Sequence, residues 1–170
     1  MPGLENYLAL VNRVDELCHR TVEKLGSHIY CRAGCDACCL HISVFAVEAA
    51  ALKEALAKLS EEDAALVREA ALQARADGPC PLLHNGLCLL YEARPIICRT
   101  HGLPLLVQRD GESRVDFCPS NFRGLPNIPG DAVIDLERLN TVLATINALY
   151  LKDFPGRERL TIARVLTLPD

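Results

Sequence analysis

Cysteine is the residue in this chain with the most chemistry to offer. Of the 170 residues, nine are cysteines, at positions 18, 31, 35, 38, 39, 80, 88, 98 and 118. Four of them gather in one short stretch, as Cys31-x3-Cys35-x2-Cys38-Cys39. Thiolates spaced two to four residues apart allow a short loop to wrap around one metal ion or cluster. This first group therefore predicts a metal site rather than a piece of apolar core.

The remaining candidate ligands are more widely spread along the chain. They are Cys80, Cys88, Cys98 and Cys118, and Cys80 and Cys118 are each followed by proline, as in the bacterial ferredoxin run that ends in Cys-Pro. Together with the first group they make eight thiols, enough for two four-thiolate sites or for one site with spares. Cys18 falls on the apolar face of a predicted helix, so we assign it to the core.

The adjacent pair Cys38-Cys39 restricts how these thiols can be shared. Neighbouring side chains of an extended chain point to opposite sides. We therefore expect Cys38 and Cys39 to serve different metals, or one of them to stay unligated.

Several neighbouring side chains could support such a site. A four-thiolate zinc or iron–sulfur centre carries net negative charge and favours nearby donors and cations. Three arginines lie near candidate ligands in the sequence and could supply the compensating positive charge: Arg32, Arg94 and Arg99. His41 and His101 lie close in sequence and could replace a thiolate on zinc, although an ordinary surface or loop histidine is the simpler interpretation.

The composition excludes several other kinds of protein. Apolar residues make up 50% and charged residues 24% of the chain, as in ordinary globular domains. The net charge is −4, and no cluster of lysines and arginines offers a surface for nucleic acid. No apolar run is long enough for a membrane span, and residues 1–6 lack the pattern of a secretory signal. We expect a cytoplasmic protein, whose reduced cysteines bind metal rather than form disulfides.

The full set of motifs resembles a known family. The pattern joins the first cysteine group to Cys80-Pro81-Leu82-Leu83, Gly86-x-Cys88-x2-Tyr91-x2-Arg94-Pro95-x2-Cys98-Arg99 and Cys118-Pro119. It is similar to the YkgJ-type cysteine-cluster family, also called the CxxCxxCC family, which is described as zinc- or iron-chelating. All eight motif cysteines of that family have a counterpart here. The resemblance implies metal binding through these eight residues, and it covers 31–119.

The segments around the motifs predict a mainly helical scaffold. Apolar spacing predicts helices over 4–25, from Ser43 to about Leu59, and over 131–152 with Asp131 as its cap. Ser60-Glu61-Glu62-Asp63 resembles a capping box for another helix, which would end before Gly78. Asn85-Gly86 and Asp110-Gly111 predict tight hairpins, residues 91–99 a short helix, and 160–168 a strand or a short helix. We expect one domain over 1–170, mainly α, with a small cysteine-rich α+β insert at 31–119.

The function predicted from these features is a metal-binding protein that holds an iron–sulfur cluster or zinc. The two Cys-Pro junctions and the tight first group favour the cluster. It would serve in electron transfer, in redox sensing, or in structural support of a protein partner, and no catalytic triad or phosphate-binding loop predicts an enzyme.

Two alternatives remain open. Cys35-Asp36-Ala37-Cys38 is a CxxC motif that would suit a thiol–disulfide oxidoreductase, although the strand–helix–strand pattern expected around it is missing. The spacing of Cys31, Cys35 and Cys38 also matches that of radical-SAM enzymes, although the alternating strands and helices on which such enzymes are built are missing.

Overall fold

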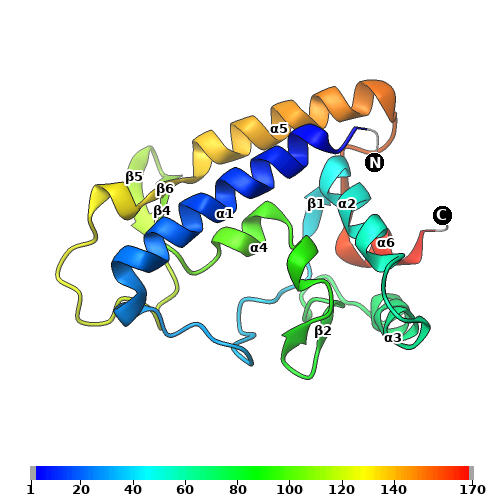
Figure 1. The fold of residues 1–170 in the computed structure, drawn as a ribbon, viewed down its shortest axis with the longest axis horizontal. Helices are drawn as coiled ribbons and strands as arrows, with labels where there is room; N and C mark the ends of the chain where they lie inside the picture. The colour runs from blue at the N-terminus through cyan, green and yellow to red at the C-terminus, as the bar shows by residue number, and fades with distance from the viewer. Residues whose placement is uncertain (1–2, 169–170) are drawn as a thin grey trace.

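The computed structural model describes residues 3–168, and about half of these residues are helical (Figure 1). The α-helices are α1 (Glu5–Leu25), α2 (Ala46–Leu56), α3 (Glu61–Leu72), α4 (Ile96–Thr100), α5 (Leu136–Asp153) and α6 (Ile162–Thr167). Short 3₁₀ turns are η1 (Gly26–His28), η2 (Tyr91–Ala93) and η3 (Gly130–Ala132). The expectation of a mainly α fold with short hairpins is confirmed at this coarse level.

The strands are short and form small sheets. They are β1 (Ser43–Phe45), β2 (Leu83–His84), β3 (Leu87–Cys88), β4 (Leu105–Arg109), β5 (Glu112–Asp116), β6 (Ile134–Asp135) and β7 (Arg159–Thr161). The antiparallel pairs are β1–β7, β2–β3 and β4–β5, and β6 joins β4 in parallel. The β2–β3 and β4–β5 hairpins turn at Asn85-Gly86 and Asp110-Gly111, as predicted, and all four of these residues have positive φ. That conformation is the one that a two-residue type I′ turn requires.

Two apolar cores position the cysteine-rich segment. In the first core, α1 and α5 run antiparallel side by side and α4 lies against α1 (Figure 1). Val14 of α1, Ile96 of α4 and Leu143 of α5 are buried there. In the second core, α2, α3 and α6 pack around Leu52, Val67 and other buried residues. The loop from 29 to 42 passes between these two groups of helices, below α4 in this view.

Helix α4 has five residues and carries Cys98, and neighbouring elements anchor it at both ends. Isolated helices this short are unstable in water. At its start, the buried Glu48 carboxylate accepts from the backbone N–H of Ile96 at 3.0 Å and of Phe45 at 3.0 Å. Near its end, Arg99 donates to both carboxylate oxygens of Asp15 on α1, at 2.8 and 2.9 Å. These contacts fix Cys98 relative to α1 and α2.

Two predicted helix starts are wrong. Ser43 does not cap α2, because it lies in β1 opposite Thr161, and the helix begins at Ala46. Asp131 does not cap α5, since it lies in η3 and pairs with Lys24 of α1. Asp135 takes that place and accepts from the backbone N–H of Arg138 at 2.9 Å. In both cases the residues before the helix bond to distant segments, which apolar spacing does not reveal.

The other predicted elements are close to those observed. The helix over 4–25 is α1, and Ser60 caps α3 by accepting from the backbone N–H of Asp63 at 3.0 Å. Residues 91–99 do not form one helix, because Pro95 separates η2 from α4. The tail at 160–168 contains both alternatives, with β7 followed directly by α6.

Glu48 offers a test of how α4 is held. We predict that Glu48→Ala lowers the free energy of unfolding by about 2–6 kcal/mol, because it leaves one buried and one partly buried N–H group unpaired at about 1–3 kcal/mol each. Urea unfolding measures the change. The matched control is Glu54→Ala on the same helix, which removes a partly exposed pair with Lys58 and should change stability little. Equal effects of the two variants would contradict this role of Glu48.

Candidate metal centre

The eight predicted ligands form two adjoining groups of four, which meet where the side chains of Cys38 and Cys39 share a hydrogen bond. All nine cysteines lie within residues 3–168 and are free thiols. We define the outer set as Cys31, Cys35, Cys38 and Cys118, and the inner set as Cys39, Cys80, Cys88 and Cys98. Three members of the outer set are exposed, whereas all four of the inner set are half-buried.

The inner set is assembled by three separate pieces of backbone. Cys80 precedes the β2–β3 hairpin, Cys88 is the last residue of β3, and both pack against the second core. Cys98 comes from α4, and Cys39 is brought alongside Cys80, whose backbone N–H donates to the Cys39 carbonyl at 2.8 Å. Burial, followed by the nearby thiols of Cys80, Cys88 and Cys39, raises the pKa of Cys98 to about 12. The four thiols are therefore within electrostatic range of one another.

The outer set lies at the surface, on the loop that follows α1. Two successive turns build it. The backbone N–H of Cys35 donates to the carbonyl of Arg32, and the backbone N–H of Cys39 donates to the carbonyl of Asp36. Burial raises the pKa of Cys31, and the thiols of Cys118, Cys35 and Cys38 raise it further. Cys118 thus joins the three cysteines of the loop, although it lies far along the chain.

Glycines allow the segments that carry the cysteines to approach closely. A Cβ on Gly86 would lie 3.3 Å from the Cα of Gly34, so the hairpin turn touches the cysteine loop. Gly34 has φ +87°, a conformation that glycine adopts without steric cost, so the loop can turn tightly there. A Cβ on Gly102 would lie 3.4 Å from both Cys31 Sγ and Cys118 Cβ. The loop, the hairpin and the segment after α4 therefore meet around the cysteines.

The electrostatics of the thiols favour a bound cation. Burial raises the pKa of Cys80 to about 11, and it also raises the pKa of Cys38, Cys39 and Cys88. A thiol in such surroundings stays protonated unless a positive ion compensates its charge. Backbone N–H groups already point at two sulfurs, because Leu82 donates to Cys80 and Leu90 to Cys88. Donors of this kind tune thiolate ligands in iron–sulfur proteins, so the donor set fits a metal centre.

The spacing of the donors is looser than a single ion requires. Among residues 3–168, no three Cys, His, Asp or Glu side chains are arranged closely enough to hold one metal ion. Zinc would draw four sulfurs to within about 3.8 Å of each other, since each Zn–S bond is about 2.3 Å long. The structure therefore brings each set into one neighbourhood without closing it around an ion.

Asn121 is the supporting residue that the sequence analysis missed. Its side chain is 2% exposed, and its Nδ2 donates to Cys31 Sγ at 3.4 Å and to the Gly102 carbonyl at 2.8 Å. Its Oδ1 accepts from the backbone N–H of Tyr30 at 2.9 Å. The amide thus orients Cys31 and joins both ends of the outer set. Its position three residues after Cys118 was the available signal, but an Asn in a loop has many ordinary roles.

The three arginines that could balance charge have different roles. Arg99 is engaged by Asp15 and by the carbonyls of Arg94 and Glu92, so it anchors α4. Arg94 lies 3.5 Å above the ring of Tyr91, and its charge opposes the burial that raises the pKa of Cys88. Its buried Nε has no hydrogen-bond partner among the described residues. Arg94 is therefore the cation placed to balance the inner set, while Arg32 lies beside the outer set.

The remaining candidates are His41, His101 and Cys18. His41 receives a hydrogen bond on Nε2 from the backbone N–H of Ala163, and its Nδ1 faces the Arg75 carbonyl at 2.9 Å. Both ring nitrogens of His41 are thus occupied. His101 is exposed at the end of α4. Cys18 lies on α1 against the first core and donates to the Arg99 carbonyl, and burial raises its pKa to about 11.

Comparison with known families decides what kind of domain carries these cysteines. Residues 30–119 match the family model CxxCxxCC, described as "Putative zinc- or iron-chelating domain". The chain belongs to the CxxCxxCC family. The match covers both cysteine sets, so the binding of zinc or iron is the property that this CxxCxxCC protein shares with its family. No curated protein and no solved structure matches the chain. None of the helices within 3–168 is both long and apolar enough to cross a membrane.

Asn121 can be tested directly against metal affinity. Asn121→Asp replaces the donor to Cys31 with a carboxylate that repels a thiolate. We predict an affinity for zinc or iron about 10–100-fold lower, the usual cost of losing a partner of a ligand. Competition with a chromophoric chelator measures it. The control is Asn140→Asp on the exposed side of α5; if both variants bind metal equally, Asn121 does not support the site.

Proposed function

We propose that this protein binds metal through all eight cysteines of the two sets, and that the bound metal is an iron–sulfur cluster. The observation that carries the proposal is the gathering of eight thiols into two adjoining groups of four that meet at Cys38 and Cys39. Four thiolates are the full ligand set of a [4Fe–4S] or [2Fe–2S] cluster. They are also the full set of a structural zinc site, which is the alternative metal.

Two features support a cluster over zinc. Backbone N–H groups donate to the sulfurs of Cys80 and Cys88. Cys80 and Cys118 precede prolines, and a Cys-Pro junction also ends the bacterial ferredoxin run.

The chain's own residues would hold and insulate the metal. When bound, a cluster supplies one-electron redox chemistry. Leu82 and Leu90 are buried beside the inner set, which keeps water away from Cys80 and Cys88. The outer set is exposed, so an electron could enter or leave there on contact with another protein. Electron transfer or redox sensing is therefore the role that we propose, with structural support of a partner protein if the metal is zinc.

A thiol–disulfide oxidoreductase receives less support from the structure. In such enzymes the CxxC lies at the N-terminus of a helix, which lowers the pKa of the first thiol. Here Cys35 and Cys38 lie in two successive turns outside any helix. The three small sheets among residues 3–168 also lack the repeated parallel strand–helix units expected of a radical-SAM enzyme.

Metal analysis of cysteine variants tests the ligand assignment. We predict that Cys35→Ser and Cys98→Ser each lower the metal content of anaerobically purified protein, because each set loses one of four ligands. The control is Cys18→Ser, which should leave metal content unchanged. Iron and zinc are measured by elemental analysis, together with acid-labile sulfide and the visible spectrum. Equal metal loading in all three variants would exclude this ligand assignment, and a colourless protein with zinc alone would exclude the cluster.

Removal of the metal should destabilise the fold. The inner set joins the hairpin, α4 and the cysteine loop, so binding there adds to the free energy of folding. Metal present at 100 times its dissociation constant would contribute about 2.7 kcal/mol, and we predict a loss of at least that size after chelation. Thermal unfolding before and after chelation measures it. An unchanged midpoint would show that metal does not tie these segments together.

A further inference from the structure

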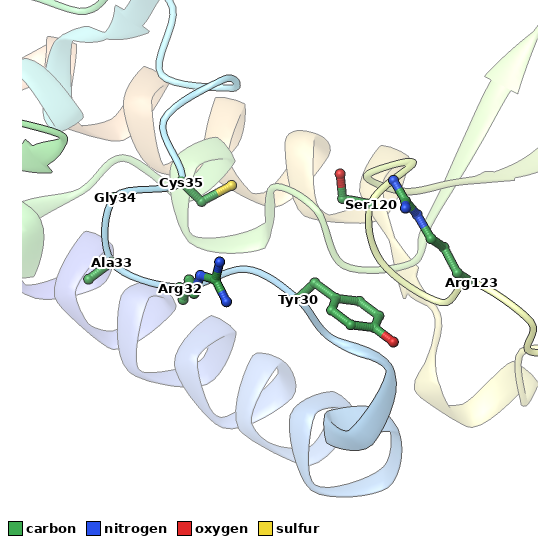
Figure 2. A pocket seen from close by; sticks show the side chains of 7 residues that line it. All are labelled: Tyr30, Arg32, Ala33, Gly34, Cys35, Ser120 and Arg123. Carbon is green, nitrogen blue, oxygen red and sulfur yellow. The ribbon is translucent and has the colours of Figure 1, made fainter.

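An open pocket lies beside the outer cysteine set and shares Cys35 with it. It has a volume of about 640 Å³ and is lined by Tyr30, Arg32, Ala33, Gly34, Cys35, Ser120 and Arg123. Figure 2 shows the cysteine loop on one side of it and the segment that carries Ser120 and Arg123 on the other. The Cys35 sulfur points into the space between them. Pockets of this size hold small organic molecules.

The charged side chains that line this pocket are all positive. Two of its seven lining residues, Arg32 and Arg123, are positively charged, and none is acidic. Within residues 3–168 neither arginine forms an ion pair. The Nε of Arg123 donates to the Pro119 carbonyl at 3.3 Å. This hydrogen bond orients the side chain and leaves both Nη groups available to a ligand. Guanidinium groups recognise carboxylates and phosphates through paired hydrogen bonds.

The two sides of the pocket are fixed to each other at their base. The backbone N–H of Phe122 donates to the His28 carbonyl at 2.7 Å, and that of Tyr30 donates to the Asn121 side chain. The segments that carry Arg32 and Arg123 are therefore held in place before any ligand arrives, which lowers the entropic cost of binding. The ring of Tyr30 is 58% exposed at this edge and can cover an apolar part of a ligand.

We propose that this pocket binds a small organic oxyanion, a carboxylate or a phosphate ester, between Arg32 and Arg123. The Tyr30 ring packs on the ligand's apolar part, and Ser120 offers a further hydrogen bond. The ligand then lies beside Cys35 and the outer set. This site goes beyond the proposed function and does not depend on it, since its charge comes from arginines whichever metal the cysteines hold.

Benzoate and phenyl phosphate are suitable probes, because each carries one anionic group on an aromatic ring and chelates metal weakly. We expect saturable binding of at least one of them to the full-length protein as purified, measured by ligand-observed NMR titration. The two probes distinguish a carboxylate site from a phosphate site. Benzamide is the neutral counterpart of benzoate and should bind at least about tenfold more weakly. Equal binding of benzamide, or no saturable binding of either anion, would overturn the proposal.

Arginine variants connect the binding to this pocket. The double variant R32Q/R123Q should weaken anion binding at least about tenfold, because it removes both charge-assisted contacts. The control R109Q/R138Q changes the net charge by the same amount on β4 and α5 and should bind as the unmodified protein does. Unchanged affinity in R32Q/R123Q would overturn the proposal. So would loss of metal without loss of anion binding, since the arginines would then serve to balance the cysteine charge.

Metal content, measured on the same samples, separates this inference from the proposed function. A metal-free protein that binds benzoate through its arginines would contradict the proposed function and leave the oxyanion site standing. A metal-loaded protein that fails to bind either anion would do the reverse.

Discussion

In an extended chain, two thiols on consecutive residues point to opposite sides, and the cysteine loop carries such a pair at Cys38 and Cys39. Cys31 lies within electrostatic range of Cys118, Cys35 and Cys38, whereas Cys98 lies within range of Cys80, Cys88 and Cys39. Cys38 and Cys39 also share a hydrogen bond between their side chains. The cysteine loop therefore adjoins both groups of thiols at this pair, and it contacts the hairpin turn where Gly34 meets Gly86.

Local signals in the sequence were sufficient for much of the scaffold. Asn85-Gly86 and Asp110-Gly111 predict their turns because both residues of each pair tolerate positive φ. Apolar spacing identifies α1 because its buried side chains recur every three to four residues. Signals of this kind fail where a segment bonds to a distant partner. Ser43 and Asp131 precede apolar helical stretches, but strand pairing in β1 and β6 delays each helix by several residues.

The candidate site shows the same limit. The list of cysteines could be taken directly from the sequence, because four thiols in one short loop are poor core material. That Cys38 and Cys39 serve different metals, or that one stays unligated, remains a prediction, and the neighbours of each cysteine required the tertiary structure. Cys118 joins the loop through the turn at Gly102, and Asn121 bonds Cys31 across 90 positions of the chain. Contacts between residues so far apart in the chain leave no periodic pattern in the sequence. The different roles of Arg94 and Arg99 could not be predicted from the sequence, because they depend on contacts with Tyr91 and Asp15.

The unequal burial of the two sets has a consequence for how the protein matures. The inner thiols lie half-buried between the hairpin, α4 and the second core, so a metal reaches them less readily once these segments have packed. Three of the four outer thiols remain exposed on the finished surface. Under the proposed ligation, the inner centre exchanges its metal more slowly than the outer centre, which can be lost and restored during the lifetime of the molecule.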